Sequence, residues 1–159
     1  MTTTGVPRDV IVVGVDGSEP SLMALRWAMS LAELMRCDVQ AVMAWHQFVS
    51  VGFSGMGVGA IGDWDPQTLA SQILNSAVDG VCGTDRPANV SCVVTEGVPA
   101  KVLLDAAVDA RMLVVGSRGH GGFTGLLLGS VSGACAEHGT CPVLVIHGTT
   151  PAPTTGASL

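Results

Sequence analysis

The stretch MLVVGSRG at residues 112–119, followed after nine residues by GSVS at residues 129–132, carries the strongest signal in the chain. Its apolar start is typical of a strand buried in a parallel sheet. The glycines let the backbone adopt positive φ and approach a ligand closely. The helical pattern that follows begins with N–H groups and with the positive end of the helix dipole. The stretch therefore predicts a strand, a loop and a helix whose junction suits a phosphate group.

Strand and helix patterns alternate along the rest of the chain. The predicted strands span residues 10–15, 39–45, 90–95, 112–115 and 142–146, and the predicted helices span about residues 20–36, 66–81, 99–107 and 131–138. This alternation indicates the α/β class, with a parallel sheet and right-handed crossovers. Ligands bind such sheets beyond the carboxyl ends of the strands. The first and fourth strands end in unusual turns, DGS at residues 16–18 and GSRG at residues 116–119, so we expect a crevice between them.

The patterns indicate one domain, at residues 8–148, between two tails. Residues 1–7 form the N-terminal tail and lack the features of a signal peptide. Residues 149–159, rich in Thr, Pro, Ala and Gly, are expected to be disordered. The glycine-rich segment at residues 49–63 has the composition of a flexible loop. It contains GVGAIG, but this dinucleotide fingerprint applies only where it joins a strand directly to a helix.

Composition excludes several classes of partner. The net charge of −6 and the isoelectric point near 4.9 argue against nucleic acid binding, which favours a basic face. No apolar run reaches the ~18–20 residues of a membrane span, and a cytoplasmic location is expected.

Five cysteines without a C-x-x-C pair predict reduced, mostly buried thiols. The P-loop, H-E-x-x-H and G-x-S-x-G motifs are missing, so the sequence shows no machinery for efficient phosphoryl transfer.

The spacing of Gly116, Gly119, Gly129 and Ser130 resembles the ATP-binding signature of the universal stress protein family, which is G-x-x-G, nine residues, then G-S or G-T. Further matching segments are VDGS at residues 15–18, EGVP at 96–99, LLLGSV at 126–131 and CPVLV at 141–145. The resemblance covers about residues 8–147. It implies a Rossmann-like α/β fold with a five-stranded parallel sheet of order 3-2-1-4-5 and helices on both faces. It also implies bound ATP, with Mg²⁺ or Mn²⁺ on the phosphates.

The resemblance implies roles for individual residues of an adenine nucleotide site. Asp16 would lie at the adenosine end, where a carboxylate can accept hydrogen bonds from an adenine amine or a ribose hydroxyl. The backbone of Trp45 would face the adenine. The residues expected near the ribose and phosphates are Gly116, Arg118, Gly119, His120, Gly129, Ser130, Val131 and Ser132. Among these, Ser130 is expected both to cap the following helix and to donate its hydroxyl to phosphate. No catalytic residue or protein metal ligand is assigned.

The predicted function is a nucleotide-dependent regulatory module of the stress response, with an unidentified protein partner. The alternatives are binding of another adenine nucleotide such as cyclic AMP, slow ATP hydrolysis, or a partner-binding module without nucleotide.

In the family's strand order, residues 143–146 form an edge strand. A bare apolar edge is an aggregation hazard. Family members pair through this strand, so a homodimer is expected.

Overall fold

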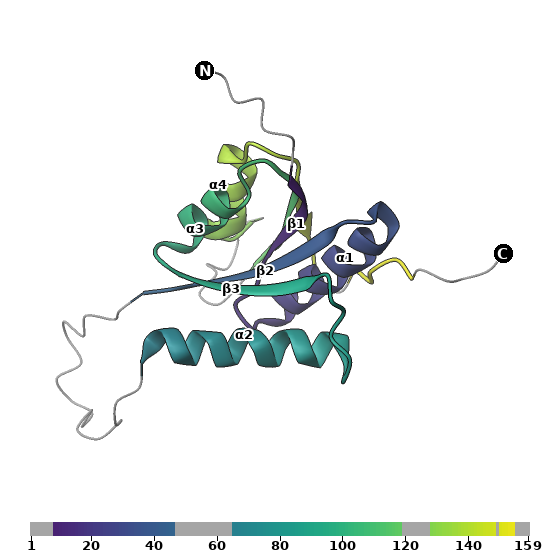
Figure 1. Ribbon diagram of the computed structural model, residues 1–159. Helices are drawn as coiled ribbons and strands as arrows, with labels where there is room; N and C mark the ends of the chain where they lie inside the picture. The colour runs from purple at the N-terminus through teal and green to yellow at the C-terminus, as the bar shows by residue number, and fades with distance from the viewer. Residues whose placement is uncertain (1–7, 47–64, 119–127, 149, 155–159) are drawn as a thin grey trace, which may run out of the picture.

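The computed structural model describes residues 8–46, 65–118, 128–148 and 150–154, in which strands and helices alternate (Figure 1). The strands are β1 (Arg8–Gly14), β2 (Asp38–Trp45), β3 (Val90–Glu96), β4 (Ala110–Gly116) and β5 (Val143–Ile146), and the helices are α1 (Glu19–Met35), α2 (Pro66–Cys82), α3 (Pro99–Ala106) and α4 (Ser130–His138). Each predicted element is present, with ends that differ from the prediction by two residues or fewer. The apolar periodicity of the sequence was therefore sufficient to find them.

The strands form one parallel sheet of order β3-β2-β1-β4-β5, which confirms the predicted topology. The central strand β1 pairs with β2 on one side and with β4 on the other; Val12 lies opposite Gln40 and Leu113. The chain crosses from one half of the sheet to the other after β3. The order of the strands therefore reverses between β1 and β4, where such sheets bind ligands.

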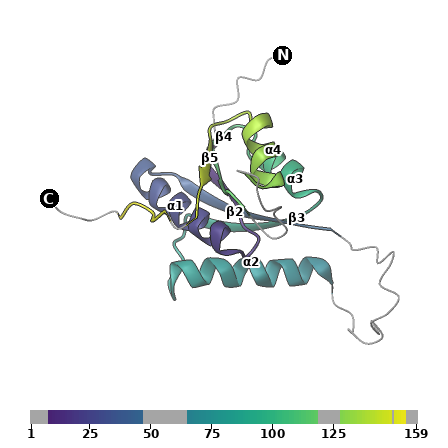
Figure 2. The ribbon, with the colours of Figure 1, turned by 180° about the vertical axis from the view of Figure 1, so that it is seen from behind.

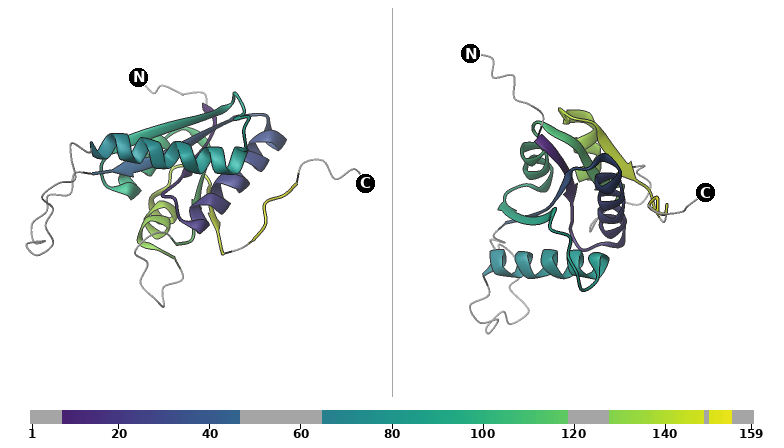
Figure 3. Two further views of the ribbon diagram at one scale, coloured as in Figure 1. Left: turned by 90° about the horizontal axis from the view of Figure 1, so that it is seen from below. Right: turned by 45° about the vertical axis from the view of Figure 1, so that its right-hand side comes forward.

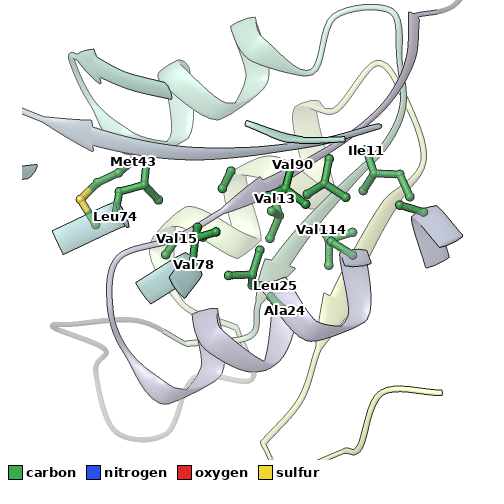
Figure 4. Packing of buried hydrophobic residues seen from close by; sticks show 14 of the residues in the cluster. Ile11, Val13, Val15, Ala24, Leu25, Met43, Leu74, Val78, Val90 and Val114 are labelled. Atoms are coloured by element: carbon green, nitrogen blue, oxygen red, sulfur yellow. The ribbon is translucent and has the colours of Figure 1, made fainter. Parts of the chain in front are cut away.

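Helices cover both faces of the sheet, as predicted. Figures 1 and 2 show α1 and α2 on one face and α3 and α4 on the other, and in the left view of Figure 3 α1 and α2 lie side by side. Successive side chains of a strand point to opposite faces. In β1, Ile11 and Val13 belong to the core under α1 and α2, while Val12 belongs to the core under α3 and α4. Figure 4 shows Val13 and Val114 packed beside Leu25 of α1.

In the segment after β5, residues 150–154 belong to the described structure. The indole Nε1 of Trp27, in α1, donates a hydrogen bond to the carbonyl oxygen of Thr150 at 2.9 Å. The Thr150 N–H and hydroxyl both donate to the carbonyl of His147, at 3.2 and 2.9 Å. These bonds position the start of the tail against α1. None of the described helices is long and apolar enough to cross a membrane.

Candidate functional site

A cavity of about 280 Å³ lies at the carboxyl ends of β1 and β4, where α4 begins. Seven of the residues predicted from the sequence line this cavity: Asp16, Gly116, Arg118, Gly129, Ser130, Val131 and Ser132. They come from two segments about a hundred residues apart, around Asp16 and from Gly116 to Ser132, which the sheet brings together. The remaining walls are mostly apolar and come from the end of β1 and the residue after it, and from β2, β4 and α3: Gly14, Val15, Val42, Ala44, Pro99, Leu103 and Val115. Ser21 of α1 adds one polar side chain.

Three other predicted residues are placed differently. Trp45 is the last residue of β2 but does not line the cavity. The preceding residue, Ala44, lines it instead. The Trp45 carbonyl accepts a hydrogen bond from the Gly97 N–H at 2.8 Å, and its side chain packs on the α1–α2 face. Gly119 and His120 lie outside the described residues.

The turn after β1 fixes the position of Asp16. The Oδ1 atom of Asp16 accepts hydrogen bonds from the backbone N–H of Ser18, at 2.9 Å, and from the Ser18 hydroxyl. The Asp16 N–H donates to the hydroxyl of Ser21 at 3.3 Å. Gly17, between them, has φ +85°, a conformation that glycine adopts without steric cost. Asp16 is thus held at the cavity by the same turn that caps α1.

Ser117 ties the end of β4 to both β5 and α4. Its N–H donates to the carbonyl of Ile146 at 2.8 Å, and its carbonyl accepts from the Gly129 N–H at 2.7 Å. The Ser132 hydroxyl also donates to the Ser117 carbonyl, at 2.9 Å, and lies 3.2 Å from the Gly129 carbonyl. Ser117 and Ser132 are both buried. Sequence reasoning assigned Ser117 no role, although its position between two predicted site glycines was a usable signal.

The first residue of α4 was predicted as its cap, and this is wrong. Gly129 is the N-cap, and Ser130 is already inside the helix. Gly129 has no side chain to offer, so α4 lacks the side-chain cap that Ser18 gives α1 and Asp65 gives α2. The first helical hydrogen bond runs from the Gly133 N–H to the Gly129 carbonyl at 2.9 Å. The N–H groups of residues 130–132 precede that bond and are therefore available to an anion at the positive end of the helix dipole.

The fold requires glycine at one of the two motif positions that line the cavity, Gly116 and Gly129, and not at the other. A Cβ atom on Gly116 would lie 2.8 Å from the backbone C and O atoms of Pro20, so glycine is needed there for β4 to pack against α1. A Cβ atom on Gly129 would meet its nearest neighbours at 3.4–3.6 Å, an ordinary contact, and Gly129 has φ −68°. The fold therefore has a steric requirement for glycine at position 116 and none at position 129.

The described part of the cavity wall contains one basic side chain, Arg118, and one carboxylate, Asp16. Burial raises the pKa of the thiol of Cys135, in α4, to about 11 and also raises the pKa of the Cys141 thiol, after α4, so both are uncharged at neutral pH. Within the described ranges, no group of three or more His, Cys, Asp or Glu side chains is arranged to hold a metal ion. The described protein groups thus offer an anion backbone amides, the Ser130 hydroxyl and a single guanidinium.

Comparison with known proteins agrees with this geometry. A protein-family model described as the universal stress protein family matches residues 7–147. A universal stress protein of Mycobacterium tuberculosis is 35% identical over 138 residues, which are 85% of this chain and 44% of that protein. The chain therefore spans less than half the length of the curated relatives it matches.

Solved structures share the fold. A universal stress protein in complex with cAMP is 27% identical, with a TM-score of 0.63 over 89% of this chain and 98% of its own. The Archaeoglobus fulgidus universal stress protein in complex with dAMP is 21% identical, with a TM-score of 0.51 over the same shares, and supports the fold alone. Together with the family match over residues 7–147, these findings show that the chain belongs to the universal stress protein family.

Proposed function

We propose that this protein binds an adenine nucleotide, ATP, in the cavity between β1, β4 and α4. The observation that carries the proposal is the start of α4, which has no side-chain cap and borders the cavity with the backbone of residues 130–132. Such a helix start favours a phosphate through both its N–H groups and its dipole. Bound nucleotide would make the protein a regulatory module of the stress response in the cytoplasm, acting on a protein partner.

The cavity has a separate place for each part of the nucleotide. The apolar side chains of Val42, Ala44 and Leu103 suit a planar base, and the carboxylate of Asp16 can accept hydrogen bonds from the ribose hydroxyls or the adenine amine. The phosphates would lie over Gly129 and the N–H groups that follow, beside Arg118. In this proposal Ala44, rather than Trp45, borders the adenine at the end of β2, and Gly119 and His120 complete the phosphate end.

In this proposal a divalent cation is bound mainly by the phosphates of the nucleotide. ATP carries about four negative charges, and one guanidinium in the described wall balances few of them. Mg²⁺ is commonly held by substrate phosphates with one or two carboxylates rather than by an all-protein cage. We therefore place Mg²⁺ or Mn²⁺ on the phosphates.

Calorimetric titration of Gly129→Ala with ATP and Mg²⁺ tests the phosphate site. The added methyl group is tolerated by the protein itself, with neighbours no closer than 3.4 Å. In this proposal it would crowd a phosphate that approaches the Gly129 backbone closely. We expect ATP affinity to fall at least about tenfold, the equivalent of ~1.4 kcal/mol. The matched control is Gly133→Ala, one turn into the same helix, where a Cβ meets nothing within 4 Å. Wild-type affinity in both variants would contradict the proposal.

Cyclic AMP is the second candidate ligand, because a structural neighbour at 27% identity is in complex with it. The two ligands differ in the polyanionic tail, which only ATP extends along α4. Mass spectrometry of the nucleotide released when the purified protein is denatured would distinguish them. Displacement of a bound adenosine probe by cyclic AMP at lower concentration than by ATP would favour the second candidate.

Slow ATP hydrolysis is a weaker alternative. The one carboxylate of the described wall, Asp16, already accepts two hydrogen bonds from Ser18 and is poorly placed to serve as a general base. We expect no turnover above background. Phosphate release that disappears in Asp16→Ala would instead establish an enzymatic role.

We also propose a homodimer through β5, which is an edge of the described sheet. The Pro142 carbonyl accepts a hydrogen bond from Leu113 of β4, and the Ile146 carbonyl accepts one from Ser117, directly after β4. In a parallel ladder the backbone groups of the odd-numbered residues between Pro142 and Ile146 therefore face outward. Val145→Pro removes one outward N–H while leaving the bonds to β4, and proline is tolerated at such positions of edge strands. Light scattering should report a dimer for the wild type and a folded monomer for this variant. A wild-type monomer at micromolar concentration would contradict the dimer.

A further inference from the structure

A second hollow lies at the opposite end of the sheet from the nucleotide cavity. It is a groove of about 690 Å³ between α1, the end of α2, the start of β3 and the segment 151–154. Val39 and Val90, near the amino ends of their strands, line it, whereas the nucleotide cavity lies at the carboxyl ends. The two sites share no described lining residue. The groove volume is within the roughly 300–1,000 Å³ typical of small-molecule sites.

The outer wall of this groove is held in place by hydrogen bonds. The segment 151–154 begins directly after Thr150, whose carbonyl accepts from Trp27 Nε1 and whose N–H and hydroxyl donate to the His147 carbonyl. Pro151 and Pro153, in the wall itself, have backbone φ angles restricted by their rings. The groove thus has a stiff outer wall anchored to α1 and to the end of β5.

The chemistry of the groove is that of an amphiphile site. Its lining is mostly apolar and includes Met23, Met29, Val81 and Val90, with the polar side chains of Ser30, Asn89 and Thr154 among them. Methionine side chains adapt to flexible apolar ligands because they are unbranched and polarizable.

Arg26 supplies a cation at the rim, and within the described structure it makes no hydrogen bond or ion pair. Arg8, Arg86 and Arg111, by contrast, each bond to a protein acceptor. Glu33 also lines the groove, but it is two helical turns from Arg26, roughly 10 Å along the axis.

We propose that this groove binds a long-chain carboxylic acid, with the carboxylate on the Arg26 guanidinium and the aliphatic chain along Met23, Met29 and Val81. A guanidinium pairs a carboxylate with two parallel N–H···O bonds, which a neutral head group cannot reproduce. The chain would bury its methylene groups against the apolar floor, the main source of affinity for such ligands. The proposal does not depend on nucleotide binding.

The test uses dansyl-aminoundecanoic acid as a fluorescent probe, with its methyl ester as the neutral comparison. The wild-type protein should bind the acid saturably and more tightly than the ester. Arg26→Gln should weaken binding of the acid about threefold to fivefold, because the arginine is partly in solvent, and leave the ester unchanged. Ser30→Phe, which fills the groove from α1, should abolish saturable binding of both probes. Circular dichroism and thermal unfolding establish that each variant is folded.

Three controls separate this site from general charge effects and from the nucleotide site. Arg36→Gln removes the same charge from a residue that does not line the groove, and it should keep wild-type affinity for the acid. Gly129→Ala should also bind the acid normally, and ATP should not displace it. The proposal is overturned if the acid does not bind, if acid and ester bind equally, or if Arg26→Gln and Arg36→Gln have equal effects. It is also overturned if Ser30→Phe still binds the probes.

Discussion

Gly116→Ala should destabilise the protein, because the position is closed by the backbone of α1. A Cβ atom there would lie 2.8 Å from the carbonyl carbon and oxygen of Pro20 and 2.9 Å from its Cβ. Real Cβ contacts of this length with a backbone do not occur, and the proline ring cannot rotate away. Either α1 or β4 must shift, which in overpacked cores costs about 1–3 kcal/mol. For a domain of this size, that corresponds to a fall in melting temperature of roughly 2–12 °C.

Thermal and urea unfolding of the ligand-free protein measure this effect. Gly133→Ala is the control, since its Cβ meets nothing within 4 Å and alanine in a helix interior is favoured over glycine by about 0.5–1 kcal/mol. The two substitutions should therefore change stability in opposite directions. A melting temperature of Gly116→Ala at or above the wild-type value would show that the close approach of Pro20 to β4 does not constrain position 116.

Three further outcomes follow from buried or anchoring groups. Ser132→Ala removes the hydroxyl donor to the Ser117 carbonyl but leaves that carbonyl its hydrogen bond from the Gly129 N–H, so urea unfolding should show a decrease of about 1 kcal/mol in the free energy of unfolding. An unchanged midpoint would show that the bond from Ser132 to Ser117 does not stabilise the fold. Burial raises the pKa of the Cys135 thiol from 9.0 to about 11, so the unfolded chain loses this proton at lower pH than the folded one. The free energy of unfolding should accordingly fall as the pH rises from about 9 to about 11, and less so in Cys135→Ala, as measured by urea unfolding on either side of that window; an equal fall in both proteins would contradict this assignment. Trp27→Phe removes the donor to the Thr150 carbonyl, so hydrogen exchange of the Thr150 amide, which donates to the His147 carbonyl, should become faster with little change in global stability; unaltered exchange would mean that another contact holds this segment.

The fold was predictable because its signals are local. The apolar runs of β1, β4 and β5 alternate along the chain with segments whose apolar residues recur at helical spacing. Helix starts such as Asp65-Pro66 are recognisable from a capping residue followed by a proline. The crossover position followed from the family resemblance. Most of the site was also predictable, since glycines and small polar residues after a buried strand are typical of ligand loops.

Other features depend on contacts between distant segments, which the sequence does not display. The Ser117 carbonyl accepts from the N–H of Gly129, the N-cap of α4, and from the hydroxyl of Ser132, which lies 15 residues further along the chain. The prediction of Ser130 as a cap failed because serine is the commoner cap residue, whereas here the preceding glycine takes that position. The Thr150 carbonyl accepts a hydrogen bond from a tryptophan more than a hundred positions earlier, a contact that composition alone does not indicate.

The backbone amide resonances of Ser130, Val131 and Ser132 provide the most direct measurement of the central claim, which is that the uncapped start of α4 holds the phosphates of a nucleotide. We predict that ATP with Mg²⁺ shifts all three amide signals in a nitrogen–proton correlation spectrum, whereas adenosine shifts signals near Asp16 and Val42 and leaves those three in place. Equal responses to ATP and adenosine at residues 130–132, or none to either, would contradict the claim.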